Sequence, residues 1–337
     1  MHLQLGHVST ILVSTPETAK QVMKTQDIVF ASRFQPLAAK IISYDSANIG
    51  FLPYGDYWRQ MRLARFLASH AGSPVNLTQL LHSTMLTEAA WLQHITGLES
   101  KLEKLHHEID RLLDEIIDDH IVVDNNTTSM HEDLVDVLLR VQNDEKYEIT
   151  RKNIKAVILD MFSAGTDTSA TTVDWTMAEM LTNPSVLEKA QEEVRRVFGE
   201  KGYVDESKFD QLKYLKAVIK ETLRLHPPAP LLLPRLSREK CEIDECFKAE
   251  RFLDSSIDFN GNKFEYIPFG AGRRMCPGMS FGLANVEHPL ALFQYHFDWK
   301  LPNGMKHQEL DMSQLYLGVT VRRQLDMHVI PIITNPV

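Results

Sequence analysis

The chain has 337 residues, of which 44% are hydrophobic and 24% are charged. This composition is typical of a globular protein with a sizeable core. Its 36 basic residues are outnumbered by 45 acidic residues, which gives a net charge of −9. Because a protein that coats nucleic acid needs the opposite sign, nucleic acid is not expected as a partner.

The three cysteines, Cys241, Cys246 and Cys276, form an odd set without regular spacing. This argues against a disulfide framework and indicates a reducing compartment. No stretch reaches the roughly 18 consecutive apolar residues of a membrane span. Residues 1–17 also lack the charged-then-apolar design of a signal peptide. We therefore expect no membrane anchor in this chain.

The hydrophobic spacing predicts a mainly helical protein with small β-sheets, an α+β fold. Two short strands are expected within residues 3–15, turning at Gly6-His7, and a helix is expected to open at Pro16 with Thr15 as its cap. Further helices are expected at residues 56–70, 100–120, 150–181, 184–198 (after a cap at Asn183), 210–226 and 285–297.

Residues 269–278, FGAGRRMCPG, place Cys276 in an unusual setting. A lone cysteine is most often a small buried hydrophobe. Here, glycines at 270, 272 and 278 permit close backbone approach and positive φ, and Arg273 and Arg274 supply positive charge. A thiolate in this setting is suited to act as a nucleophile or as a metal ligand.

Three chemistries could use this thiol. Nucleophilic catalysis needs an activating base, and no local Cys/His signature is present. A four-ligand zinc or iron–sulfur site would need histidines to complete it, because the cysteines are too few. A metal in a macrocycle needs only one protein ligand, and thiolate-ligated haem is such a case.

The segment matches the F-x-x-G-x-R-x-C-x-G signature of the cytochrome P-450 haem-thiolate monooxygenases at every fixed position. The chain therefore resembles this family. The resemblance implies a cytochrome P-450 fold and a haem with Cys276 as the axial iron ligand. It also implies that the surrounding loop binds the cofactor, with Arg274 near a haem propionate. The loop residues concerned are Phe269, Gly270, Gly272, Arg274 and Gly278.

The sequence AGTDTS at 164–169 resembles the oxygen-binding groove of the family. Small Ala164 and Gly165 would let dioxygen and substrate lie against the helix. Asp167 and Thr168 resemble the acid–alcohol pair that delivers protons. Without the resemblance, these two would be ordinary polar residues within a helix.

Two further motifs resemble family elements that hold the cofactor. Glu221 and Arg224 would on their own be a surface pair of helix neighbours. They are similar to the E-x-x-R pair that, with a later arginine, braces the cysteine loop. FKAERF supplies that arginine, Arg251, although Ala249 stands where the family usually has proline.

The last motif is PYGDYWRQMR at 53–62, which matches the W-x-x-x-R helix of the family. Trp58 and Arg62 are four residues apart and so share a helix face. The resemblance implies that they bond a haem propionate, and the planar guanidinium suits a carboxylate.

The resemblance covers most of the chain and is strongest to plant microsomal terpenoid hydroxylases. It implies a single domain over 1–337, which inserts one oxygen atom from O2 into a small apolar metabolite. Electrons would come from an NADPH-dependent flavoprotein reductase, for which Arg273 is a candidate contact or simply a solvated arginine. The expected location is the cytosolic face of the endoplasmic reticulum membrane.

Departures from the family leave a second interpretation open. No anchor like the N-terminal anchor of microsomal members is expected in this sequence. Deletions are expected near 63–95 and 244–246, so the fold is expected to be incomplete. Candidate pocket lining is limited to Ala164, residues 228–235 and residues 317–319. The chain is either an active monooxygenase or an inactive truncated remnant that keeps the haem motifs without turnover.

Overall fold

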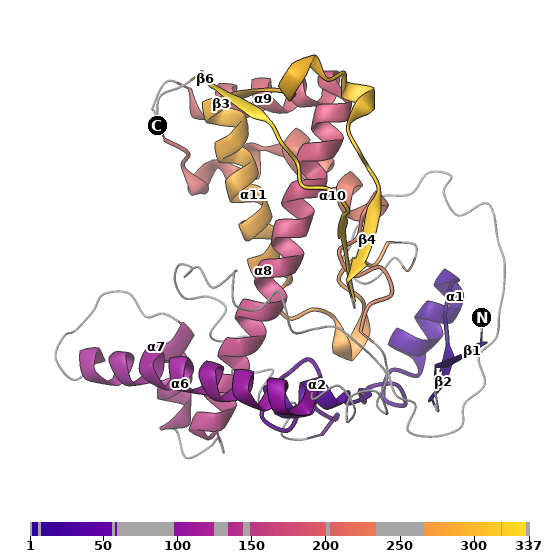
Figure 1. Cartoon of the computed structure of the whole chain (residues 1–337), viewed down its shortest axis with the longest axis vertical. Coiled ribbons are helices and arrows are strands. Elements are labelled where there is room, and N and C mark those ends of the chain that lie inside the picture. Colours follow the sequence, from indigo (N-terminus) through magenta and orange to yellow (C-terminus); the bar gives the residue numbers. More distant parts are fainter. Residues whose placement is uncertain are drawn as a thin grey trace. The chain divides into compact units, whose positions relative to one another are not determined.

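A computed structural model gives the structure of most of the chain (Figure 1). The described residues are 2–5, 8–55, 58, 98–124, 134–143, 149–199, 203–233, 264, 266–317 and 319–334. They form a mainly helical structure with three two-stranded sheets, which confirms the predicted fold class. None of the helices in these ranges is both long enough and apolar enough to cross a bilayer.

The chain divides into two compact units. The first contains residues 1–164 and 232–278, and the second contains residues 165–231 and 279–337. The boundary falls within helix α8, Arg151–Thr182. A single functional domain over 1–337, with deletions near 63–95 and 244–246, stays a prediction.

The first unit begins with an antiparallel pair of strands, in which Leu5 lies opposite Val8. Helix α1 starts at Pro16, and Oγ1 of Thr15 accepts a hydrogen bond from the backbone N–H of Thr18 at 3.3 Å, as predicted. The elements of this unit are β1 (His2–Leu5), β2 (Val8–Ile11), α1 (Pro16–Lys20), the π-helix η1 (Gln21–Thr25), α2 (Leu37–Ile42), α6 (Leu98–Asp124), α7 (Leu134–Gln142), the start of α8, and the 3₁₀ turn η4 (Gly272–Arg274).

The main core of the first unit lies between α6, α7 and the start of α8. Leucine and isoleucine recur along α6 at steps of three and four, so they share one face. Ile117 of α6, Leu138 of α7 and Ile154 of α8 are fully buried. The predicted helix at 100–120 is confirmed and extends slightly beyond both ends.

A row of ion pairs runs beside this core, between α6 and α8. The ammonium of Lys155, whose side chain is 8% exposed, lies 2.7 Å from Asp110 Oδ1 and 2.6 Å from Asp114 Oδ2. The hydroxyl of Tyr44 donates to Asp110 at 2.8 Å, and burial together with this carboxylate raises the pKa of Tyr44. Burial alone would raise the pKa of Asp110, but the hydrogen bonds from Lys155 and Tyr44 outweigh it and lower the pKa.

This row predicts acid-sensitive folding. The hydrogen bond from Lys155 holds the pKa of Asp114 below its usual value. The pKa of an aspartate carboxyl in the unfolded chain is about 3.9. A carboxyl whose pKa is lower in the folded state stabilises the fold at pH values above about 3.9, and this stabilisation is lost as the pH falls through the folded-state pKa. We expect Asp114→Asn to lower the free energy of unfolding by about 1 kcal/mol at pH 7 and to reduce the difference between pH 7 and pH 3. Urea unfolding at both pH values measures this, and equal pH dependence in both proteins would contradict it.

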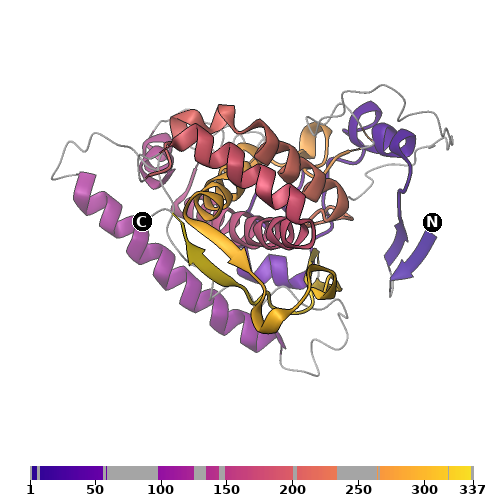
Figure 2. The same ribbon diagram turned by 90° about the horizontal axis from the view of Figure 1, so that it is seen from above.

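The second unit contains the rest of α8 and the C-terminal elements. Strand β3 pairs with β6 and strand β4 pairs with β5, both antiparallel. Figure 2 shows the β3–β6 pair. The elements after α8 are α9 (Pro184–Phe198), the 3₁₀ turn η2 (Glu206–Gln211), α10 (Lys213–Leu225), α11 (Met279–His296), β3 (Phe297–Lys300), the turns η5 (Pro302–Gly304) and η6 (His307–Glu309), β4 (Gln314–Leu317), β5 (Thr320–Arg323) and β6 (Ile330–Ile333).

Helices α9, α10 and α11 pack against one another in this unit. Buried Glu193 of α9 accepts hydrogen bonds from the backbone N–H groups of Tyr214 and Leu215, each at 2.9 Å. These donors lie in the first turn of α10, where helix N–H groups lack partners within the helix. The carboxylate thus fixes the start of α10 against α9.

Three elements differ from the predicted ones or are only partly described. Asn183 precedes α9 but makes no side-chain cap; its Nδ2 donates to the carbonyl of Glu179 at 2.8 Å, so it serves the end of α8 instead. Helix α11 starts at Met279, earlier than the predicted 285, and includes Pro289. Of the predicted helix at 56–70, only Trp58 is among the described residues, and it is helical.

Candidate functional site

The loop that carries Cys276 closes on itself through its backbone. The N–H of Cys276 donates to the carbonyl of Phe269 at 2.9 Å, and Gly270 N donates to Ile267 O at 2.8 Å. Between them, Met275 N donates to Gly272 O at 3.1 Å and closes η4. The thiol side chain of Cys276 is exposed. The loop therefore presents the sulfur outward from a hydrogen-bonded backbone.

Two glycines give this loop its shape. Gly270 and Gly272 have φ angles of +69° and +68°, a region that residues with a side chain rarely adopt. A Cβ atom at Gly272 would lie 1.7 Å from the carbonyl oxygen of Met23. The loop thus packs its backbone directly on η1, and only glycine fits at 272.

Arg274 is buried, with 7% of its surface exposed. Its guanidinium donates to the carbonyl oxygens of Ala31 at 2.6 Å, Ile49 at 3.0 Å and Leu52 at 2.5 Å. Its Cζ atom also lies 4.6 Å from the ring centroid of Trp58, which is 4% exposed. The structure therefore brings together two residues that were predicted to bond propionates.

One residue of this arrangement was missed in the sequence. Asp160 of α8 is buried, and its two oxygens accept from Asn48 Nδ2 at 2.8 Å and from Ile49 N at 2.7 Å. It therefore holds the 48–52 segment, whose carbonyls in turn hold Arg274. The sequence did contain a signal for this role, because Asp160 stands within the apolar run VILDMF. A carboxylate buried in such a run needs hydrogen-bond partners.

Arg273 is more than a solvated arginine. Its side chain is 43% exposed, yet Nε lies 3.1 Å from Asp27 and Nη1 donates to Tyr54 Oη at 3.0 Å. The hydrogen bond with Asp27 raises the pKa of Arg273. Its predicted contact with a reductase stays a prediction.

The AGTDTS motif lies in the middle of α8, as predicted. Ala164 is exposed and is the last residue of the first unit before the division. In the second unit, a Cβ atom on Gly165 would lie 3.1 Å from Cε1 of Phe281, so the missing side chain makes room for that ring. Asp167 and Thr168 follow and are partly buried.

The predicted pair on α10 is present. Arg224 Nε and Nη2 donate to the two oxygens of Glu221 at 2.9 Å and 2.6 Å, and this hydrogen bonding lowers the pKa of Glu221. Both side chains are more than half exposed. Arg251 and Arg62 lie outside the described residues, so the brace with Arg251 and the propionate contact of Arg62 stay predictions.

The donor set around Cys276 fits a haem. Haem needs a single protein ligand, and a thiolate suits its iron. Cys276 supplies one exposed sulfur on a glycine-shaped loop, and a buried arginine against a tryptophan lies in the same unit.

Comparison with known proteins agrees with these features. A cytochrome P-450 family profile matches residues 75–247 and 245–327. Salviol synthase of Salvia pomifera is 42% identical, with 99% of this chain and 84% of the relative covered. Premnaspirodiene oxygenase of Hyoscyamus muticus is 42% identical, with 97% and 84% covered. This chain therefore belongs to the cytochrome P-450 family of monooxygenases.

The fold agrees with solved members of the family. A zebrafish cytochrome P-450 solved with progesterone superposes with a TM-score of 0.74 and 20% identity, covering 100% of this chain and 96% of the other. The sequence alignments with salviol synthase and premnaspirodiene oxygenase are 425 and 424 positions long. Both are longer than this chain, which has 337 residues. The relatives therefore contain internal stretches that have no counterpart here, and their exact positions stay predictions.

Proposed function

We propose that this chain is a haem-thiolate monooxygenase that hydroxylates a small apolar plant metabolite of the terpenoid class, with Cys276 as the axial iron ligand. The observation that carries the proposal is the Cys276 loop. It has the complete family signature, and its geometry presents the sulfur on a backbone that only glycine at 272 permits.

Haem, when bound, would supply the oxygen-activating iron chemistry. Cys276 would hold the iron, and Trp58, Arg62 and Arg274 would hold the propionates. Phe269, Gly270 and Gly278 would shape the loop, while Glu221, Arg224 and Arg251 would brace it. Of the two small residues predicted to leave room for dioxygen and substrate beside α8, Ala164 would do so, whereas the ring of Phe281 lies beside Gly165. Asp167 and Thr168 would deliver protons there.

The reaction balances with an external electron donor. One oxygen atom of O2 enters a C–H bond of the substrate and the other leaves as water, which consumes two electrons and two protons. An NADPH-dependent flavoprotein reductase would supply the electrons. The enzyme would act at the cytosolic face of the endoplasmic reticulum membrane.

The terpenoid class rests on the relatives. Their names include premnaspirodiene oxygenase and, from Nicotiana tabacum, 5-epiaristolochene 1,3-dihydroxylase, which is 40% identical. Incubation with reductase, NADPH, premnaspirodiene and isotopically labelled dioxygen tests the proposal. We expect a hydroxylated product with one labelled oxygen atom, and a product whose hydroxyl oxygen is unlabelled, and so comes from water, would contradict oxygen insertion from O2.

The proton-delivery role of Thr168 predicts a specific kinetic defect. Thr168→Ala removes the hydroxyl but leaves the cysteine loop unchanged. We expect an unaltered ferrous carbonyl spectrum. The amount of product formed per O2 consumed should fall at least about tenfold, because positioned proton transfer contributes on the order of 10²–10⁴-fold. Thr172→Ala, one turn further along α8, is the matched control. A normal product yield in Thr168→Ala would refute the relay.

An inactive remnant is the second candidate, and the missing internal stretches favour it. Lost core elements weigh heavily against the marginal stability of a protein domain. A remnant that binds haem would give the thiolate spectrum but would neither consume NADPH nor form product when reductase and premnaspirodiene are added.

A further inference from the structure

Four successive residues of the cysteine loop contact the N-terminal part of the first unit. Ala271 is fully buried in an apolar cluster with residues of α1 and η1. Gly272 packs on the backbone of η1, and Arg274 donates to backbone carbonyls further along the chain. Arg273 differs from these three residues because it contacts a carboxylate, that of Asp27. The loop therefore has one charged contact with this segment besides its apolar and backbone contacts.

The contact between Asp27 and Arg273 is close and partly shielded from solvent. Nε of Arg273 lies 3.1 Å from each carboxylate oxygen of Asp27. The side chain of Asp27 is 18% exposed and that of Arg273 is 43% exposed. The hydroxyl of Tyr54 also accepts from Nη1 of Arg273 at 3.0 Å, and the Tyr54 ring centroid lies 5.7 Å from Cζ. A carboxylate and a phenol thus hold the guanidinium in place.

Asp27 stands in a run of hydrogen-bonded turns that follows η1. Gln26 N donates to Gln21 O at 2.8 Å, and Val29 N donates to Gln26 O at 3.0 Å. The Cβ atom of Asp27 lies 3.7 Å from the position that a Cβ atom on Gly272 would take. The backbone at Asp27 is therefore fixed directly beside the cysteine loop.

The pair places two opposite charges near the thiol of Cys276. Arg273 precedes Cys276 by three residues, so their Cα atoms are at most about 11 Å apart. Charges at such distances shift an equilibrium that changes the charge at a metal, although solvent weakens the effect. One-electron reduction of a haem iron adds a negative charge, which a positive neighbour favours and a negative neighbour disfavours. With both partners present, the two contributions largely cancel.

We propose that Asp27 is a positioning residue for Arg273, and that this charge pair sets the reduction potential of a haem ligated by Cys276. Asp27 keeps the guanidinium beside the cysteine loop and offsets its charge. The inference rests on the proposed function for the haem, but the anchoring of the loop by Asp27 does not. Neither residue of the pair is a predicted haem contact. Changes at the pair should therefore shift the potential without removing the thiolate band.

A redox titration of the haem-loaded protein, without a reductase, tests the charge pair. Asp27→Asn keeps an acceptor for Arg273 but removes the negative charge. We expect reduction to become about threefold more favourable, which raises the potential by about 28 mV at 59 mV per tenfold change. Arg273→Gln keeps a donor for Asp27 but removes the positive charge, so we expect a shift of similar size in the opposite direction. A general disturbance of the loop would move both potentials in one direction. Shifts of the same sign, or no shift in either variant, would overturn the role in the potential.

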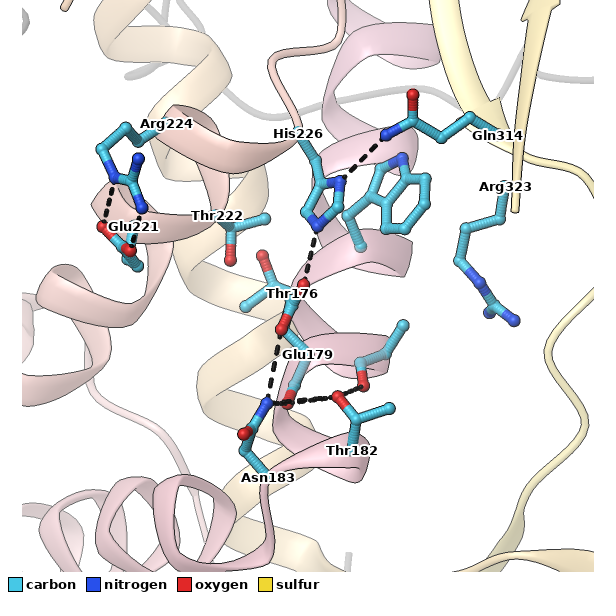
Figure 3. A network of polar contacts seen from close by, with 12 residues as sticks. Thr176, Glu179, Thr182, Asn183, Glu221, Thr222, Arg224, His226, Gln314 and Arg323 are labelled. Carbon is cyan, nitrogen blue, oxygen red and sulfur yellow. Dashed lines mark hydrogen bonds and ion pairs between the residues drawn. The ribbon is translucent and has the colours of Figure 1, made fainter. Parts of the chain in front are cut away.

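Three further variants are controls for the titration. Asp27→Glu keeps the charge, and the double variant Asp27→Asn/Arg273→Gln removes both charges, so both proteins should have a potential close to that of the wild type. Glu179→Gln is the matched control because it removes another shielded carboxylate, 25% exposed, that lies 2.7 Å from Nε2 of His226 (Figure 3). Its potential should be unchanged. A shift in Glu179→Gln equal to that in Asp27→Asn would show that the position of the lost charge does not matter, and would also overturn the proposal.

Hydrogen exchange of the full chain tests the anchoring of the loop without turnover. The N–H groups of Met275 and Cys276 donate to carbonyls within the loop. Asp27→Ala removes the acceptor as well as the charge, so we expect about threefold faster exchange at these two amides, a modest factor because the contact is partly exposed. Asp27→Asn should keep most of the protection, and exchange in α9 should stay unchanged. Equal exchange at the two amides in Asp27→Ala and in the wild type would overturn the positioning role.

The two measurements separate this inference from the proposed function. A wild-type protein without the red-shifted ferrous carbonyl band would overturn the haem-thiolate function, and with it the role in the potential, whereas hydrogen exchange would still decide the anchoring by Asp27. A wild-type protein that has the band, but whose variants at Asp27 and Arg273 have unshifted potentials, would overturn the charge pair alone.

Discussion

Cys276→Ser is expected to abolish the red-shifted ferrous carbonyl band of a haem-thiolate protein. A serine hydroxyl is far less acidic than a thiol and does not ligate the iron as a thiolate does. The exposed sulfur lies on a loop that its own backbone hydrogen bonds hold closed, so the substitution leaves the loop intact. The measurement is the difference spectrum of the reduced, haem-loaded protein with and without carbon monoxide.

Cys241→Ser and Cys246→Ser are the controls for this prediction. Neither cysteine belongs to the signature at residues 269–278, so each variant should keep the band at the wild-type position and intensity. A thiolate band that survives in Cys276→Ser, or that disappears in one of the two controls, would assign the iron ligand to another cysteine.

Gly272→Ala is expected to remove the haem site by displacing the loop. The added Cβ would lie 1.7 Å from the carbonyl oxygen of Met23, and φ at this position is +68°. The left-handed conformation alone costs roughly 1–2 kcal/mol for a residue with a side chain. The clash is with backbone, which cannot rotate away, so we expect a total loss above about 3 kcal/mol. Thermal unfolding and the carbon monoxide difference spectrum measure the two effects.

Gly304→Ala separates the clash from the backbone conformation. Gly304 has a similar φ angle of +71°, but a Cβ there would meet no atom within 4 Å. We expect a loss of roughly 1 kcal/mol and an unchanged spectrum. If Gly272→Ala were no more harmful than Gly304→Ala, close packing of the loop on η1 would not be the reason for glycine at 272.

Features that depend on neighbouring residues in the chain were predictable from the sequence. The helix at 100–120 was predicted because apolar residues recur at helical spacing, and it matches α6 closely. The long helix predicted at 150–181 matches α8. The start of α1 at Pro16 followed from its cap at Thr15. The ion pair of Glu221 with Arg224 followed from their spacing on one helix.

Features that depend on which helices lie together were not predictable. Asp160 accepts a hydrogen bond from Ile49, which lies 111 residues earlier in the sequence. His226, at the end of α10, contacts Glu179 of α8. Neither spacing is a local pattern, so only the packed structure reveals these partners. At Asn183, a local pattern gave a wrong prediction. Asparagine favours the N-cap position, but the side-chain amide of Asn183 donates to a carbonyl of the preceding helix instead.

The most direct test of the central claim is the carbon monoxide difference spectrum of the wild-type chain, expressed with a haem precursor and reduced. We predict the red-shifted Soret band of a thiolate-ligated ferrous carbonyl. A chain that takes up no haem, or one whose carbonyl band lacks the red shift, would contradict a haem-thiolate site at Cys276.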